Sequence, residues 1–453
     1  MDSTRATLLR LFVFALALRW AYDVALFLTM GREGLMGADS RGYLTLAHEF
    51  AAAARGGSLS GWQWLGPDLP VMPLSSWLLT ANMLLFGELV PLTYVMSQGI
   101  IDAGTCLLIY GIACGFDDRY AYPAAVAAAI NPTQIVLSGL IYIDTPFVFF
   151  VALFLFGAIR WLALPSWRYA ILIGVGLGGA ALVRVLIVPW VAVLMGLLLL
   201  VCVLRRKFRL QYVGHVAAAS IVFGVLVAPI LARNVTQYGA WAFTPQTGAH
   251  VSYWIVPLVR EAKDGTPWAH GAKQMSVRVK KRLGDRKSSN PFETSTLVAE
   301  IGWQELRGLG PSAVIKAWIF GAAINLGSPA VILSPPIARL PRTGFYGTEG
   351  HSLTDKVFNF LFRSDNAAYA WALLVGLAGV AILRAVQLCG LGALLAGLSN
   401  PAGLLLLLMW IGFVLAVNGP VASPKYRLPI EPALMVLTGA GFCALRDWRR
   451  QRR

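Results

Sequence analysis

Long apolar runs separated by short polar segments dominate the chain. These runs predict membrane-spanning helices, because crossing a bilayer takes about 20 predominantly apolar residues. They cover residues 8–30, 72–86, 91–114, 120–137, 147–164, 169–203, 211–231, 367–386, 404–417 and 429–445. The run 169–203 is long enough to be broken in two, and residues 312–333 form either a span or an interfacial helix. We therefore expect an all-α polytopic membrane protein with about 9–12 transmembrane helices.

Composition supports this fold class. Charged residues make up 13% of the sequence, whereas soluble domains carry roughly 25%. The net charge of +16 comes partly from basic clusters beside the spans, at residues 205–209 and 446–453. Such clusters are typical of cytoplasmic flanks, so we expect no nucleic-acid partner.

The same clusters predict the topology. With the N-terminus, residues 205–209 and the C-terminus in the cytoplasm, the segments 31–70, 233–310 and 418–427 face the other side. The basic run 278–287 departs from the rule, although long loops largely escape it. We expect an N-terminal transmembrane module over 1–232, with a functional first outer loop at 31–70. An extracytoplasmic region with an interfacial or re-entrant helix would follow over 233–365, and C-terminal transmembrane helices over 366–453.

The first outer loop carries an acid just before a short amphipathic pattern. Tyr43, Leu44, Ala47 and Phe50 recur at helical spacing after Asp39. Asp39 or Ser40 is a candidate cap for this helix. The alternative is that Asp39 is a carboxylate at the membrane surface, acting as a general base or stabilising charge.

Further polar residues stand beside spans. Asn131-Pro132 breaks or kinks a helix, and Asp144 is either the N-cap of the next helix or a second acid near a site. Arg233 leaves a span toward the outside, and Lys425 and Arg427 precede the last span. These three cations either anchor the chain at the interface or bind a phosphate.

Two ionisable residues lie inside predicted spans, namely Asp102 and Arg184. Because a charge at bilayer depth is costly, each should face the protein interior or a cavity. They either pair with each other or line a substrate groove. The five histidines show no metal-ligand spacing, and the five cysteines no disulfide framework.

Four motifs occur in a fixed order. They are Asp39, Tyr43 and Ala47 in the first loop; Asn131 to Ser138 followed by Asp144; Pro229, Arg233, Asn234 and Gly239; and Tyr426 to Pro429. Together they resemble the GT-C superfamily of membrane glycosyltransferases, especially bacterial relatives of protein O-mannosyltransferases and of the lipid A aminoarabinose transferase. The resemblance extends over residues 8–445.

The resemblance implies an enzyme of a bacterial inner (plasma) membrane with an extracytoplasmic site. Such an enzyme transfers a hexose or pentose from a polyprenyl-phosphate donor to a glycan, lipid or protein acceptor, usually with inversion. Asp39 would be the general base, and Arg233, Lys425 and Arg427 would bind the donor phosphate. Tyr43, Asp144, Asp102 and Arg184 would line the site.

One departure from the family concerns metal binding. Many relatives carry a second acid directly after the first, where this chain has Ser40. We therefore expect no cofactor and no metal ligands, although a divalent metal remains an alternative.

Two other classes of function compete with this reading. A transporter or flippase of lipid-linked sugars would favour paired repeats and broken helices meeting at the membrane midplane. A glycan polymerase or ligase would use diphosphate-linked donors. The clustering of polar residues on one predicted face favours the glycosyltransferase.

Overall fold

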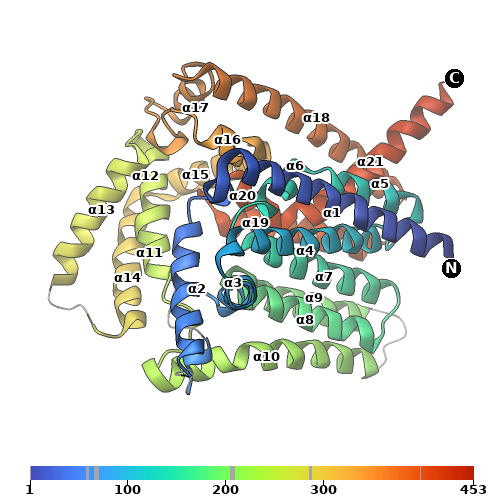
Figure 1. Ribbon diagram of the computed structural model, residues 1–453, viewed down its shortest axis with the longest axis horizontal. Helices are drawn as coiled ribbons and strands as arrows, with labels where there is room; N and C mark the ends of the chain where they lie inside the picture. Colours follow the sequence, from blue (N-terminus) through green and yellow to red (C-terminus); the bar gives the residue numbers. More distant parts are fainter. Residues whose placement is uncertain are drawn as a thin grey trace. The chain divides into compact units, whose positions relative to one another are not determined.

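The computed structural model describes residues 2–57, 61–65, 71–204, 210–284, 288–397 and 399–452 (Figure 1). Within these ranges the regular structure is helical, so the predicted all-α fold is confirmed. The basic cluster 205–209 and the end of the run 278–287 lie outside the described residues. Two compact units result. Unit 1 comprises Met1–Ile230, Ala381–Val414 and Leu428–Arg453, and unit 2 comprises Leu231–Val380 and Leu415–Arg427.

The first ten α-helices lie mainly in unit 1. They are α1 (Asp2–Met30), α2 (Ser40–Arg55), α3 (Pro73–Phe86), α4 (Val90–Ala113), α5 (Asp118–Ala129), α6 (Pro132–Ser138), α7 (Asp144–Ala163), α8 (Trp167–Val183), α9 (Val188–Leu204) and α10 (Leu210–Tyr238). Short 3-10 segments flank several of them, at η1 (Gly31–Leu35), η2 (Gln63–Leu65), η3 (Gly87–Leu89) and η4 (Val185–Ile187).

The later elements belong to unit 2 up to residue 380. They are α11 (Thr247–His250), η5 (Val251–Ile255), α12 (Val256–Asp264), α13 (Trp268–Leu283), α14 (Pro291–Leu309), α15 (Pro311–Gly327), η7 (Ala330–Leu333), α16 (Pro335–Ala338), η8 (Phe345–Gly347) and α17 (Leu353–Phe362). The chain ends with α18 (Ala367–Gly397), α19 (Pro401–Asn418), α20 (Pro424–Arg427), η9 (Leu428–Ile430) and α21 (Glu431–Gln451).

Eight of the described helices are long and apolar enough to cross a membrane: α1, α4, α7, α9, α10, α18, α19 and α21. Two shorter apolar helices, α3 and α8, accompany them. α14 and α15 form a ninth candidate only if they count as one span, and they are bent by 103°. The break expected within residues 169–203 is confirmed, since α8 ends at Val183 and α9 begins at Val188.

The single span expected over residues 120–137 is wrong. The chain forms two short helices there, α5 and α6, because Asn131 ends the continuous run. The Asn131 side chain accepts a hydrogen bond from the backbone N–H of Thr133 at 2.9 Å and so caps α6. Its amide donates to Glu431 Oε2 at 3.0 Å. The predicted break at Asn131-Pro132 is therefore confirmed, but as the boundary between two helices.

Small residues allow the helices of unit 1 to pack closely. A Cβ added at Gly176 of α8 would lie 2.5 Å from the backbone nitrogen of Phe154 on α7, and one at Gly179 would lie 2.3 Å from the Phe150 ring. Transmembrane helices typically associate through such small residues, because lipid provides little hydrophobic drive between helices. Outward-facing side chains such as Leu28 and Val203 remain exposed, as expected for a surface in contact with lipid.

Candidate functional site

The loop that carries Asp39 is fixed by hydrogen bonds to the segment before α7. The Ile141 N–H donates to the Leu35 carbonyl at 3.0 Å, and the Ser40 hydroxyl donates to the Ile141 carbonyl at 2.8 Å. The Ala38 N–H donates to the Tyr142 hydroxyl at 2.9 Å. These bonds hold residues 35–40 in one position on unit 1.

Gly37 is required at the closest approach within this loop. A Cβ added there would lie 2.2 Å from the Tyr142 ring, far inside van der Waals contact. The Gly37 N–H also donates to the Ser40 hydroxyl at 2.8 Å. Sequence reasoning missed Tyr142, although its place in the second motif, two residues before Asp144, was a usable signal.

Asp39 occupies the N-cap position of α2, yet its side chain makes no capping hydrogen bond. The capping interpretation of Asp39 or Ser40 is therefore wrong, since Ser40 binds Gly37 and Ile141 instead. The Asp39 side chain is exposed, whereas Ser40 is fully buried. The loop thus presents a carboxylate at its surface while burying the neighbouring hydroxyl.

Tyr43 lies one turn further along α2. It packs against an apolar cluster that includes Leu26, Leu35 and Tyr94, while Ala47 and Phe50 are buried on the same helix. The predicted amphipathic helix is confirmed. Tyr43 anchors the start of α2 beside Asp39.

Asp144 and Arg184 form an ion pair within unit 1. Arg184 Nη2 lies 2.8 Å from Asp144 Oδ1, and the Asp144 side chain is only 1% exposed. Asp144 is the first residue of α7, and Ile143 takes the N-cap position expected for it. Arg184 lies at the break after α8. The pair links two of the predicted site-lining residues, and Asp144 follows Tyr142, which holds the Asp39 loop, by two positions.

Asp102 pairs with a different arginine. Arg19 Nη2 lies 2.7 Å from Asp102 Oδ2, and Gln134 donates to Asp102 Oδ1 at 2.9 Å. The alternative in which Asp102 pairs with Arg184 is wrong. Both partners are buried, so Asp102 has a packing role that needs no substrate.

Arg19 was missed by the sequence reasoning. It also donates to the carbonyls of Ala128, at 3.1 Å, and Ala129, the last residues of α5. A cation at this position complements the negative end of the helix dipole. Arg19 could have been found because an arginine inside a predicted span needs a partner for its charge. Asp23, fully buried one turn further on, was missed for the same reason.

Arg233 is held by the residue that follows it. Arg233 Nε donates to Asn234 Oδ1 at 3.0 Å, and Asn234 Nδ2 donates to the carbonyls of Ala242 at 2.6 Å and Phe243 at 3.1 Å. Gly239 ends the helix with a φ of +65°, a conformation that glycine adopts without strain. The third motif therefore builds the turn after α10 and orients Arg233.

The segment before the last helix is docked on the C-terminus of α15. The Asn325 side chain donates to the Val421 carbonyl at 3.2 Å and accepts from the Ser423 N–H at 2.9 Å. Arg427 Nη1 donates to the carbonyls of Asn325 at 3.1 Å and Ser328 at 2.6 Å. Arg427 is 2% exposed, whereas Lys425 is half-buried.

The predicted residues are thus distributed over both units. Asp39, Tyr43, Asp102, Asp144 and Arg184 lie in unit 1. The three predicted phosphate-binding cations lie in unit 2, namely Arg233, Lys425 and Arg427. Among the described residues, no cluster of three or more His, Cys, Asp or Glu side chains has the arrangement of a metal site.

The fold is similar to that of membrane glycosyltransferases of the GT-C type. The chain matches the oligosaccharyltransferase AglB of Archaeoglobus fulgidus, solved with an inhibitory peptide and a dolichol-phosphate. The TM-score is 0.54 and the identity 14%, over 97% of this chain and 50% of that one. The same enzyme tethered to an acceptor peptide gives a TM-score of 0.55 at 13% identity, over 98% and 50%. The predicted GT-C-like fold is confirmed.

The sequence gives a more specific likeness over part of its length. Residues 68–232 match the family model of dolichyl-phosphate-mannose-protein mannosyltransferases. This segment contains Asp102, Asp144 and Arg184, whereas Asp39, Arg233, Lys425 and Arg427 lie outside it. The match to this family model confirms the predicted resemblance to the GT-C superfamily.

Other comparisons add little. ArnT from Cupriavidus metallidurans, bound to undecaprenyl phosphate, gives a TM-score of 0.41 at 15% identity, over 96% of this chain and 77% of that one. A comparison with curated proteins gives no match. The chain spans about half the length of the oligosaccharyltransferase chains that it matches.

Proposed function

We propose that the chain is a glycosyltransferase that moves a hexose or pentose from a polyprenyl-phosphate donor to an acceptor hydroxyl on the extracytoplasmic side of the membrane. The observation that carries the proposal is the Asp39 loop. Two backbone groups and the Ser40 hydroxyl hold this loop through hydrogen bonds to Ile141 and Tyr142, yet the Asp39 side chain is exposed. A fixed loop with an exposed acid suits a catalytic base, because such a group must be held in place while it meets its substrate.

In this mechanism Asp39 accepts the proton of the acceptor hydroxyl. The oxygen attacks the anomeric carbon as the bond from that carbon to the phosphate oxygen breaks, and the electron pair leaves with the polyprenyl phosphate. Attack opposite the leaving group inverts the anomeric configuration. Asp39 then releases its proton to water.

The leaving phosphate needs positive charge more than it needs a proton, because it departs as a stable anion. Arg233 and Lys425 are the proposed phosphate ligands. Asn234 orients the Arg233 guanidinium, which favours binding in a defined geometry. Arg427 adds positive charge and, through its bonds to α15, holds the short helix that carries Lys425.

The proposed transfer is independent of metal and of any cofactor. Ser40 stands where many relatives carry a second acid, and its hydroxyl is bound to Gly37 and Ile141. The proposed site therefore contributes a single exposed carboxylate at this position. Tyr43 packs the start of α2 against its apolar cluster, and the ion pair with Arg184 holds Asp144 at the start of α7.

The decisive experiment is transfer from radiolabelled polyprenyl-phosphate sugars by purified full-length protein in lipid nanodiscs. Asp39→Asn should lower the transfer rate at least about 100-fold, the usual contribution of a general base. Glu49→Gln, an exposed acid on the same helix, is the matched control and should retain activity. Wild-type activity in a folded Asp39→Asn variant would remove Asp39 from this role. Passage of labelled donor across sealed vesicles without transfer would support a flippase instead.

A further inference from the structure

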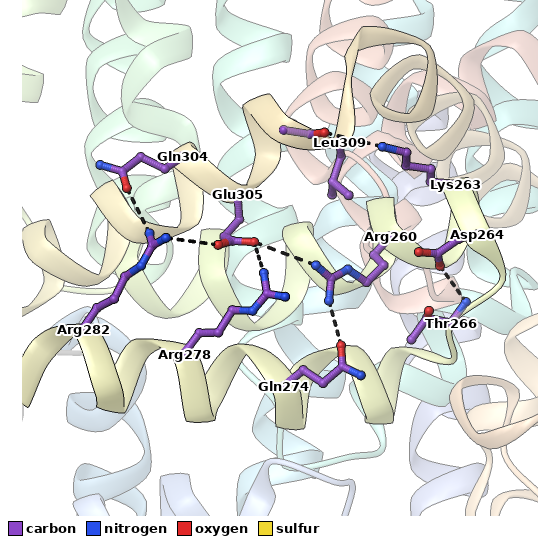
Figure 2. A pocket seen from close by; sticks show the side chains of 11 residues that line it. Arg260, Lys263, Asp264, Thr266, Gln274, Arg278, Arg282, Gln304, Glu305 and Leu309 are labelled. Carbon is purple, nitrogen blue, oxygen red and sulfur yellow. Dashed lines mark hydrogen bonds and ion pairs between the residues drawn. The ribbon is translucent and has the colours of Figure 1, made fainter.

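Three helices of unit 2 enclose a polar groove that the proposed transfer does not use. α12, α13 and α14 lie side by side, and the groove between them has a volume of about 540 Å³. Figure 2 shows its lining, in which Arg278 and Arg282 of α13 point toward Glu305 of α14. Arg260 of α12 reaches the same carboxylate.

The Glu305 carboxylate forms ion pairs with three guanidinium groups. Arg278 forms an ion pair with Glu305 Oε2, Arg260 lies 3.8 Å from the same oxygen, and Arg282 lies 3.7 Å from Oε1. Gln274 accepts a hydrogen bond from Arg260 at 2.7 Å, and Gln304 accepts one from Arg282 at 3.0 Å. Side chains from all three helices thus set the orientation of these arginines.

The groove carries more positive charge than its own acids neutralise. Its lining contains four cations, the three arginines and Lys263, and only two carboxylates. One of these, Asp264, accepts the Thr266 N–H at 3.0 Å and so serves a local turn. Two positive charges remain in excess.

The exposed fractions of the side chains show which arginines of the groove are open to solvent. Glu305 and Arg260 are 14% and 13% exposed, whereas Arg278 and Arg282 are 45% and 49% exposed. Arg278 and Arg282 stand one helical turn apart, where like charges repel each other. A second anion beside them would relieve this repulsion.

We propose that this groove binds the phosphate monoester of a sugar-sized ligand. A phosphate monoester carries about −1.5 to −2 charge at neutral pH, which matches the excess of two positive charges. Guanidinium groups bind phosphate oxygens through paired N–H donors. The volume falls within the range of roughly 300–1,000 Å³ typical of small-molecule sites, so a sugar fits beside the phosphate.

The test measures binding without any donor. Full-length protein in phosphatidylcholine nanodiscs is titrated calorimetrically with glucose 6-phosphate, and with glucose as the neutral probe. Arg278→Gln/Arg282→Gln is compared with Lys280→Gln/Lys281→Gln. The second pair removes the same charge from exposed positions of α13 that do not line the groove.

We expect the wild type and the lysine variant to bind glucose 6-phosphate but not glucose. The arginine variant should bind at least about tenfold more weakly, because charge-assisted hydrogen bonds are lost. Arg282→Lys keeps the charge but not the planar fork, and should weaken binding in a protein that melts like the wild type. Equal binding by both double variants, or equal binding of glucose, would overturn the proposal.

Two further comparisons complete the test. The first distinguishes a lipid phosphate from a soluble one, and the second distinguishes the groove proposal from the proposed function. If the phosphate belongs to a lipid headgroup, nanodiscs containing phosphatidic acid should abolish binding of the soluble sugar phosphate; if it belongs to a soluble ligand, binding should persist. Failure of sugar transfer with intact phosphate binding would count against the proposed function alone. Intact transfer without phosphate binding in either kind of nanodisc would count against the groove alone.

Discussion

Arg427 Nη1 lies 2.6 Å from the carbonyl oxygen of Ser328, just beyond the end of α15. The same nitrogen donates to the carbonyls of Asn325 and Leu326, so Arg427 supplies the donors that the last turn of a helix lacks. Lys425, two residues away and half-buried, lies on the short helix that this contact holds in place. We therefore expect the two cations of the last motif to have separable roles.

Arg427→Met should destabilise the protein by about 1.5–3 kcal/mol, because a charged donor to the α15 carbonyls is lost. Lys425→Met should leave the melting temperature within the error of the wild type and raise the KM for the donor. Thermal melting in nanodiscs and donor titrations check the two effects. If both variants changed stability equally and KM not at all, Lys425 would have no part in donor binding.

Asn234→Ala should destabilise unit 2 by about 2–3 kcal/mol, because two hydrogen bonds to the turn after α10 are lost from a fully buried residue. The donor KM should also rise, since Arg233 loses the oxygen that orients it. Asn234→Asp is the matched control, because it keeps this oxygen but not the amide. Its stability should fall while its KM changes less; an identical KM in both variants would separate Arg233 from the phosphate site.

Tyr142→Phe should slow turnover about tenfold and leave the donor KM unchanged. The substitution removes the hydroxyl that accepts the Ala38 N–H, and catalytic geometry is sensitive to such small displacements. The expected loss of stability is about 1 kcal/mol. Tyr122→Phe, at an exposed position of α5, serves as control. Unchanged kcat in Tyr142→Phe would show that the loop does not need this bond to present Asp39.

A pH-dependent prediction concerns the buried pair Glu261 and Lys356, whose charged atoms lie 2.6 Å apart. Burial raises the pKa of Glu261 above its ordinary value, and Lys356 partly opposes this effect. Lys356→Met should raise that pKa further and destabilise the protein by about 3–5 kcal/mol at neutral pH, where a buried carboxylate is left unpaired.

The sign of the pH dependence follows from the raised pKa. The folded state of Lys356→Met binds the Glu261 proton more tightly than the unfolded state, so stability should fall as the pH rises from the unfolded pKa through the folded one. Below that window the defect should shrink. Glu261→Gln/Lys356→Met should melt with a weaker pH dependence than the single variant. A defect of constant size from acidic to neutral pH would contradict the assignment.

Hydropathy was sufficient to predict the fold class, because the bilayer imposes long apolar helices. It wrongly predicted one span over residues 120–137, because hydropathy averaged over a long window does not detect the helix cap that Asn131 makes with Thr133. Local spacing predicted the amphipathic α2. It could not show that Ser40 binds Ile141, which lies 101 residues away.

Charges inside spans show the same limit. The cost of burying Asp102 and Arg184 predicted that each needs a partner. The identity of the partners depends on which helices lie side by side, and that is set by contacts far apart in sequence. Asp102 therefore pairs with Arg19, and Arg184 with Asp144.

The pairing of Arg19 with Asp102 also bears on how the protein enters the membrane. The two residues are 83 positions apart, and chains grow at about 5–20 residues per second. The first helix therefore carries Arg19 without its Asp102 partner for roughly 4–17 seconds before that residue of α4 is made. On insertion scales such a residue at the centre of a helix costs about 2.5–3.5 kcal/mol. A nascent chain that stops before α4 should thus hold its first helix in the bilayer less firmly than the finished protein does.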